Sequence, residues 1–231
     1  MHKSTVSRIL STLQVEGLVS QNPETSKYRL GLGLISMAGV ALGRVDVRGL
    51  AQPKLVELAK RTEETVNLTV LDGDECVNVD REASPKPIRY VGWIGRRTPL
   101  HCTASGKVIL AYLPADDRRT LLRTPLQEFT DHTITDMEAF ERSLEIVRQQ
   151  GHAMVQEEFE VGFSAIAAPV FNVDGEVVAT VSISGPSFRL DEGKMSSFIG
   201  ALHAATESIS ASMGYSQSRK ERATATARIA Q

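Results

Sequence analysis

Cysteine is scarce in this sequence of 231 residues, which contains only Cys76 and Cys102. Two cysteines supply neither a disulfide framework nor a zinc cage, and this usage is typical of a protein in a reducing cytoplasm. No run of 18 apolar residues occurs, and the N-terminus has no apolar segment suited to a signal peptide, so we expect no membrane span. The sequence also lacks metal-ligand spacing among its histidines and any phosphate-binding motif, which predicts neither a metal nor a cofactor.

Charge is unevenly distributed along the chain. The net charge is −2, but residues 1–30 carry +2 and residues 215–231 carry +3, which leaves −7 for residues 31–214. A basic N-terminal segment followed by an acidic central region suggests that only the N-terminal segment binds a polyanion. Chance clustering and a solvated tail would give the same distribution, so charge alone leaves both interpretations open.

The first segment has the pattern of an amphipathic helix. Val6, Ile9, Leu10 and Leu13 recur at helical spacing and form one apolar stripe, and Gly17 is suited to the helix end. The opposite face carries hydroxyls and cations and no acid. Its residues are Lys3, Ser4, Thr5, Ser7, Arg8, Ser11 and Thr12. Such a face can approach phosphates and base edges closely, although an ordinary solvent-facing helix would have a similar composition.

A small hairpin is predicted directly after this helix. Two short extended runs, near residues 18–20 and 27–30, flank a turn that contains Pro23. The second run carries Lys27 and Arg29. A helix followed by a basic hairpin is the layout of a winged helix-turn-helix, in which the helix enters the major groove and the wing contacts phosphates of double-stranded DNA.

The rest of the sequence predicts an α+β fold, an antiparallel sheet flanked by helices. A helix over residues 32–42 is apolar almost all round and is expected to pack against a second copy. A second helix reaches about residue 61, with Leu50, Leu55, Leu58 and Ala59 expected to point inward. Strands are expected at 66–73, 74–83, 87–93, 164–171 and 176–185. Helices are expected at 103–113, 115–123, 136–151 and 191–213. The polar, basic tail over 215–231 is expected to be disordered.

Three stretches carry a resemblance to a known family. They are KSTVSRILSTLQVEGLV with the following YRLG, then GRRTPLHCTASGKVILAYL, and then VGFSAIAAPVFNVDGEVVATVSISGP. In this order they resemble the IclR family of bacterial transcription factors, from Lys3 to about Tyr215. The resemblance implies a partial winged helix-turn-helix over 1–30, linker and dimerisation helices over 31–62, and an effector-binding domain of GAF/profilin-like topology over 63–214. It also implies a homodimer or tetramer on a DNA operator, tuned by a small-molecule effector.

The effector site is expected around the start of the helix at 103–113. Thr103 is suited to cap this helix, whose free N–H groups favour a carboxylate, and Ser182 and Ser184 point to one face of their strand. The family usually has Asp or Ser where this sequence has Val155, which argues against a small, highly polar effector. The expected lining is Cys102, Thr103, Ala104, Ser105, Gly106, Val155, Ala165, Ser182 and Ser184. Close packing of small residues is the alternative explanation of the same pattern.

Two other functions stay open at this stage. The chain could be a ligand-binding module without DNA binding, or a GAF-like redox enzyme that uses Cys76 and Cys102. His101 adjoins Cys102, but neighbours in sequence cannot easily form a nucleophile–base pair, so we expect no enzyme. The acids Glu157, Glu158 and Glu160 are interpreted as a solvated strand end and loop.

The start of the chain gives one further expectation. The resemblance implies that two helices precede the reading helix and cover its apolar stripe, and this chain begins at or just before that helix. If these four large apolar side chains stay uncovered, each loses the stabilisation that burial would provide, about 1.5–3 kcal/mol. We therefore expect residues 1–30 to be mobile or to rest against another surface, and this chain to bind an operator weakly or not at all.

Overall fold

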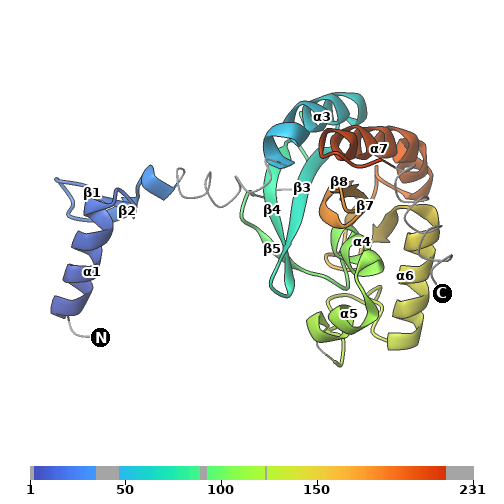
Figure 1. The fold of residues 1–231 in the computed structure, drawn as a ribbon, viewed down its shortest axis with the longest axis horizontal. Helices are drawn as coiled ribbons and strands as arrows, with labels where there is room; N and C mark the ends of the chain where they lie inside the picture. The colour runs from blue at the N-terminus through green and yellow to red at the C-terminus, as the bar shows by residue number, and fades with distance from the viewer. Residues whose placement is uncertain (1–2, 35–46, 89–92, 123, 217–231) are drawn as a thin grey trace. The chain divides into compact units, whose positions relative to one another are not determined.

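The computed structural model describes residues 3–34, 47–88, 93–122 and 124–216. The chain divides into two compact units, Met1–Asp46 and Val47–Gln231 (Figure 1). Among the described residues, no helix has both the length and the apolar character needed to cross a membrane.

The N-terminal unit contains the predicted helix and hairpin. Helix α1 (Lys3–Val15) ends at Gly17, which has a φ of 68° and allows the Leu18 N–H to donate to the Leu13 carbonyl at 2.8 Å. This left-handed residue closes the helix as the sequence predicts. Strands β1 (Val19–Gln21) and β2 (Tyr28–Leu30) then pair antiparallel.

The C-terminal unit is built on one antiparallel sheet with the strand order β5-β4-β3-β8-β7-β6. Its strands are β3 (Thr65–Asp72), β4 (Glu75–Glu82), β5 (Arg97–Pro99), β6 (Ala153–Gln156), β7 (Phe163–Phe171) and β8 (Val177–Pro186). The long strands β3, β8 and β7 lie at the centre. Their side chains alternate between two faces, and both faces are buried under helices.

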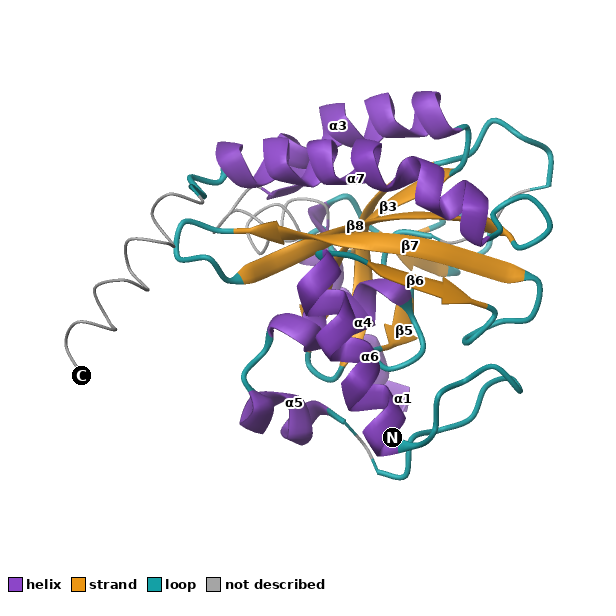
Figure 2. Ribbon diagram, turned by 90° about the vertical axis from the view of Figure 1, so that its right-hand side faces the viewer, coloured by secondary structure: helices purple, strands orange, loops and turns teal. Residues whose placement is uncertain are grey.

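Helices cover the two faces of this sheet as separate layers (Figure 2). Helices α3 (Val47–Thr62) and α7 (Glu192–Ser212) lie on one face, and α4 (Ala104–Tyr112) and α6 (Met137–Gln150) lie on the other. The first layer buries Leu55 and Leu202, and the second buries Leu110 and Phe140, all without exposed surface. Each such side chain contributes about 1.5–3 kcal/mol. The predicted α+β class is confirmed.

Local signals set the ends of the helices in these layers. Asp136 accepts from the Ala139 N–H at 2.8 Å at the start of α6, and Gly151, with a φ of 75°, ends that helix.

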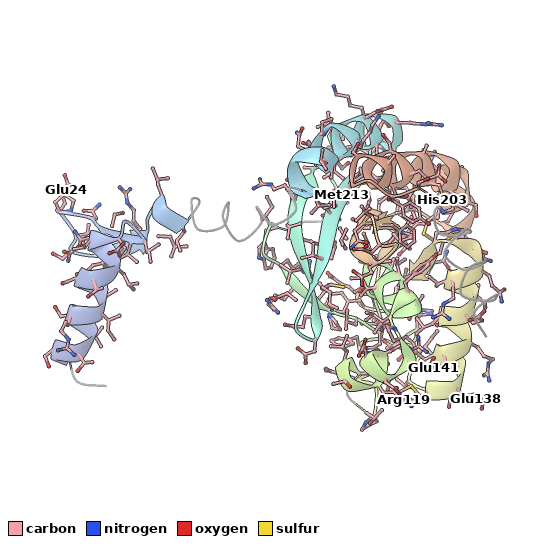
Figure 3. The ribbon with its side chains drawn as sticks, viewed as in Figure 1. Glu24, Arg119, Glu138, Glu141, His203 and Met213 are labelled. Atoms are coloured by element: carbon pink, nitrogen blue, oxygen red, sulfur yellow. The ribbon has the colours of Figure 1, made fainter. Side chains whose placement is uncertain are left out.

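A short helix, α5 (Ala115–Leu121), is joined to α6 by Arg118, which donates to both carboxylate oxygens of Glu141 at 3.2 and 2.9 Å. Figure 3 shows Glu141 on α6 near the end of the molecule that holds α5.

Several sequence predictions differ from the structure. The third strand was expected over 87–93, but its residues 89–92 lie outside the described part, and the strand that pairs with β4 is β5. The sequence did not predict β6 as a strand. Of the four residues expected to point inward on α3, Leu55, Leu58 and Ala59 are buried, whereas Leu50 is 40% exposed. The helix expected over 32–42 and the tail lie largely outside the described residues.

Candidate functional site

A cavity of about 70 Å³ lies between the sheet and the start of α4. It lies on the face of the sheet that α4 covers, and it draws its walls from all six strands or the loops that join them. The lining is Asn67, Thr69, Asn78, Thr98, Cys102, Thr103, Ala104, Ser105, Val155, Phe159, Glu160, Phe163, Ser164, Ala165, Ser182 and Ser184. Eight of the nine residues predicted for the effector site are therefore brought together.

Gly106 is the ninth predicted residue, and it lies outside the lining. A Cβ atom at this position would lie 2.1 Å from the Leu100 carbonyl oxygen, far inside van der Waals contact. Glycine is required here because α4 approaches the backbone of the preceding segment closely. This packing places the first turn of α4 against the cavity.

The start of α4 presents backbone donors to the cavity. The Thr103 hydroxyl accepts from the Gly106 N–H at 3.2 Å and donates to the Pro99 carbonyl at 2.8 Å, as expected of a helix cap. The N–H groups of a first helical turn have no acceptor within their own helix. Together with the positive end of the helix dipole, they favour an anion beside Ala104 and Ser105.

The sheet side of the cavity is polar and buried. Asn67 on β3 donates from Nδ2 to the Ser184 hydroxyl at 3.1 Å and approaches the Ser182 hydroxyl at 3.5 Å. The three residues are 4%, 3% and 6% exposed. The Oδ1 atom of Asn67 is buried and has no hydrogen-bond partner among the residues that the structure describes. A buried acceptor without a donor is costly, so this wall is suited to a polar ligand.

Apolar residues continue the sheet wall beside Ser184, whose register partner is Ala165. Val155 on β6 pairs with Ala165 on β7, and both line the cavity. Phe159 and Phe163 extend this surface from the loop between the two strands and from the start of β7. The cavity thus combines a polar sheet wall and a helix N-terminus with an apolar side, which matches a ligand that has a polar end and an apolar body.

A buried ion pair adjoins the cavity, next to the lining residue Phe159 in sequence. Lys107 of α4 pairs with Glu158, and their side chains are only 4% and 10% exposed. The interpretation of Glu158 as a solvated residue is therefore wrong, because the lysine lies beside it in space although 51 positions separate them in sequence. The backbone oxygen of Glu158 also accepts from the Thr133 hydroxyl at 2.6 Å.

A second ion pair adjoins the cavity through Glu160, which is part of the lining. An Arg96 nitrogen lies 3.5 Å from a carboxylate oxygen of Glu160, and the guanidinium lies over the rings of Trp93 at 5.4 Å and Phe159 at 5.7 Å. The Arg96 side chain is 16% exposed, whereas the Glu160 side chain is 55% exposed. Glu160 therefore has one side toward water and one toward the cavity.

The cysteines are unsuited to nucleophilic chemistry. Burial raises the pKa of the Cys76 thiol to about 12, and burial together with the Glu158 carboxylate raises the pKa of the Cys102 thiol to about 12. Both thiols thus stay protonated at neutral pH, while the thiolate is the reactive form. These surroundings argue against the redox alternative.

Half of the cavity lining was missed in the sequence. The missed residues are Asn67, Thr69, Asn78, Thr98, Phe159, Glu160, Phe163 and Ser164. Asn67 and Thr69 lie two positions apart in a strand that is otherwise rich in apolar residues, so they face the same side of the sheet. That polar pair within a buried strand is the signal that could have indicated them.

The polar face of α1 and the hairpin form a second candidate site, in the N-terminal unit. Arg8, Lys27 and Arg29 are exposed, as are the hydroxyl residues Ser4, Ser7, Ser11 and Thr12, and Thr5 is half-buried. The Ser11 and Thr12 hydroxyls donate to helix carbonyls at 3.0 Å, which leaves their oxygens as acceptors on the surface. Arg29 donates to the Ser20 hydroxyl at 2.9 Å across the hairpin. Val6 and Ile9 are 36% and 45% exposed.

Comparisons with known proteins agree on one family. The family profile described as Bacterial transcriptional regulator IclR C-terminal matches residues 39–211. The HTH-type transcriptional regulator KdgR of Escherichia coli K12 is 40% identical over 216 residues, which cover 93% of this chain and 82% of KdgR. The crystal structure of the Thermotoga maritima IclR is 34% identical with a TM-score of 0.80, over 93% of this chain and 87% of that one.

Another solved structure that is similar to this chain contains a bound ligand. It is a double mutant of the inducer-binding domain of the PobR transcription factor from Acinetobacter, in complex with 3-hydroxybenzoic acid. It is 30% identical, and the match covers 70% of this chain and 96% of that domain with a TM-score of 0.65.

Proposed function

The chain belongs to the IclR family of bacterial transcriptional regulators, and we propose that it binds a small carboxylate in the cavity beside α4 and responds by altering its binding to DNA. Regulators of this family bind DNA and small-molecule effectors, and the chain is a transcriptional regulator rather than an enzyme. The observation that carries the proposal is the meeting of a helix N-terminus with two buried serines in one cavity.

The carboxylate would take its hydrogen bonds from both walls. The N–H groups of Ala104 and Ser105 would bind it through the helix N-terminus, and the Ser182 hydroxyl would donate from the sheet. The unpartnered Oδ1 of Asn67 would accept from a hydroxyl group on the effector. A hydroxy acid with an apolar part fits these groups, in keeping with the hydroxybenzoic acid bound by the neighbouring PobR domain.

Calorimetric titration of the full chain tests this assignment. Pyruvate, D-gluconate and 3-hydroxybenzoate sample a small oxo acid, a sugar acid and an aromatic hydroxy acid. For an acid that binds, Ser182→Ala should weaken the affinity about tenfold or more, because a hydrogen bond to a charged group is worth roughly 1.5–3 kcal/mol. Ser197→Ala is the matched control, since this exposed serine on α7 only donates to the Lys194 carbonyl.

Two outcomes of the titration would reject the assignment of this cavity as the carboxylate site. Binding of none of the three acids would contradict a carboxylate effector for this cavity. Equal affinities of the wild type and Ser182→Ala would place the bound acid elsewhere.

DNA binding is proposed for the N-terminal unit, with α1 in the major groove and the hairpin on the phosphates. The exposed Arg8 would donate to a guanine edge, and Lys27 and Arg29 would contact the backbone together with Lys3 and the hydroxyl face. Duplexes enriched from random DNA by the wild-type chain supply the test. Arg8→Ala should cost about 1–3 kcal/mol and relax the preference at one base pair. Unchanged affinity would remove Arg8 from the reading face.

A homodimer or tetramer is proposed as the working form in the cytoplasm, where the operator DNA lies. The apolar sequence from residue 32 to residue 42 supports this, and Leu32, at its start, is 81% exposed. Leu34→Glu should lower the mass seen in light scattering. An unchanged mass would show that this segment does not join subunits.

In such an oligomer, effector binding would change DNA binding through the relative placement of the N-terminal units of two subunits. Coupling between the two sites requires two arrangements that differ in their affinity for DNA and for the effector.

A further inference from the structure

Two histidines lie side by side between the start of β6 and the helix α7. His152 directly precedes β6, and His203 lies in α7 (Figure 3). Their ring centres are 5.3 Å apart and the ring planes are inclined by 59°, so the rings lie close together without being stacked. The two residues come from distant parts of the sequence, so the spacing of the histidines could not indicate this pair.

Each ring buries a nitrogen that lacks a hydrogen-bond partner. The Nε2 atoms of His152 and His203 are buried and have no partner among the residues that the structure describes. His152 as a whole is 6% exposed. The His203 Nε2 faces the backbone beside His152, since a Cβ atom on Gly151 would lie 3.8 Å from it. A buried polar atom without a partner is costly, so ring packing alone does not explain two such atoms at one contact.

The hydrogen bond of His152 determines which of its ring nitrogens can bind a ligand. Its Nδ1 atom lies 3.1 Å from the Gln150 carbonyl oxygen. A carbonyl oxygen only accepts, so Nδ1 carries the proton and the Nε2 of the neutral ring keeps a lone pair. A backbone carbonyl that holds one ring nitrogen while the other binds a metal is the usual arrangement of a metal-binding histidine.

The separation of the two rings fits a shared metal ion. Zinc binds histidine nitrogen at about 2.0–2.1 Å in tetrahedral geometry, which places the centres of two coordinated rings about 5 Å apart. The observed distance between the ring centres is 5.3 Å. The backbone therefore already holds both imidazoles at the separation that one ion requires.

Glu207 is placed to supply a third ligand. It follows His203 by one turn of α7, so both side chains leave the same face of the helix. Both residues line a cavity of about 260 Å³, together with Gln150 and Gly151. In the described part of the chain no three possible ligands already surround one point, so the exposed Glu207 side chain must turn toward the imidazoles.

One positive charge in the same cavity opposes a bound cation. Arg148 belongs to the lining, but its Nε donates to the Ala111 carbonyl at 2.8 Å and its Nη1 lies 3.9 Å from a carboxylate oxygen of Glu145. These contacts hold the guanidinium at the end of α4 and offset part of its charge. A carboxylate ligand from Glu207 would offset the charge of the ion itself.

We propose that His152, His203 and Glu207 bind one divalent transition-metal ion, tested here as Zn²⁺. Two histidines and one glutamate are an established zinc ligand set, with water in the fourth position. The ion joins the start of β6 to α7 and stabilises the folded chain, because only folding brings the three ligands together. The site shares no lining residue with the cavity beside α4 and does not depend on the proposed function.

Calorimetric titration of the metal-free full chain with ZnCl₂ at about pH 7.5 tests the site. Burial lowers the pKa of His152 below 6.5, so its ring is neutral at this pH. His203→Gln and Glu207→Gln should each weaken zinc binding about tenfold or more, since even second-layer partners of metal ligands are worth 10–100-fold in affinity. His132→Gln is the matched control, because its imidazole is 63% exposed and lies outside this cavity.

Two further measurements keep a folding defect from being mistaken for a lost ligand. Thermal melts without zinc check that the variants fold, and zinc should raise the melting temperature of the wild type but not that of His203→Gln. Nitrogen NMR of the wild type should show zinc shifting the His152 Nε2 resonance while Nδ1 keeps its proton.

Absence of zinc binding by the wild type would overturn the proposal. Equal zinc affinities of the wild type and either His203→Gln or Glu207→Gln would overturn this set of three ligands. A loss of the same size in His132→Gln would assign the zinc to histidines on the surface and would overturn the proposal as well.

Discussion

Lys107 and Glu158 form a buried ion pair that fixes α4 to the segment between β6 and β7. The lysine follows Ser105 by two residues, and the glutamate precedes Phe159 and Glu160, so the pair connects two walls of the same cavity. The position of the cavity walls thus depends on a contact that itself lies outside the lining.

Removing the lysine should destabilise the protein strongly. Lys107→Met leaves the Glu158 carboxylate buried without a partner, which should lower the free energy of unfolding by about 3–5 kcal/mol in urea titrations. Arg119→Met is the control, because Arg119 on α5 forms an exposed pair with Asp116 that should be worth under about 1 kcal/mol (Figure 3). Equal effects of the two substitutions would show that burial of the Lys107 pair is unimportant.

The close approach of α4 to Leu100 can be tested with a single methyl group. Gly106→Ala brings a Cβ to 2.1 Å from the Leu100 carbonyl oxygen and should cost about 1–3 kcal/mol or more, because the backbone must shift. Gly200→Ala on α7 meets no atom within 4 Å and should stabilise its helix by up to about 1 kcal/mol. Thermal melts of the two variants should shift in opposite directions. A harmless Gly106→Ala would contradict this account of the packing.

An acidic side chain inside the cavity should act against an acidic effector. Val155 is 5% exposed and faces the ligand site, so Val155→Asp should weaken binding of an acid from the calorimetric panel about tenfold, through repulsion and lost apolar contact. Val161 is 72% exposed, and Val161→Asp adds the same charge outside the lining. An equal loss in both variants would point to a general charge effect rather than to this cavity.

His152 should make stability depend on pH. Burial lowers its pKa below 6.5, and its Nδ1 lies 3.1 Å from the Gln150 carbonyl oxygen. As the pH falls below 6.5, the unfolded chain binds a proton at this residue that the folded chain binds only at lower pH, so stability is lost. The melting temperature of His152→Gln should fall less than that of the wild type between about pH 7.5 and 5.5. Parallel curves would exclude His152 as a source of the pH dependence.

Features that depend on local sequence were predictable. The helix α6 begins and ends where Asp136 and Gly151 indicate, and the two-residue spacing of Ser182 and Ser184 placed both on the face that lines the cavity. Thr103 caps α4 as its sequence position predicts. In each case the determining interaction lies within a few residues of the chain.

Features that depend on distant partners were not predictable in the same way. Glu158 belongs to an acidic run that indicates a solvated loop, and only the folded chain brings Lys107 to it. The short strand β5 exists because β4 provides its hydrogen-bond partners, since three residues carry too little pattern to predict a strand. The contacts of Arg96 with Phe159 and Glu160 were not predictable for the same reason, because both residues lie in a distant segment of the sequence.

The most direct test of the account is a crystal structure of the full chain with the tightest-binding acid among pyruvate, D-gluconate and 3-hydroxybenzoate. The account predicts the carboxylate within hydrogen-bond distance of the Ser182 hydroxyl and of an N–H group in the first turn of α4. An acid bound elsewhere, with the cavity beside α4 empty, would contradict the assignment of this cavity as the effector site.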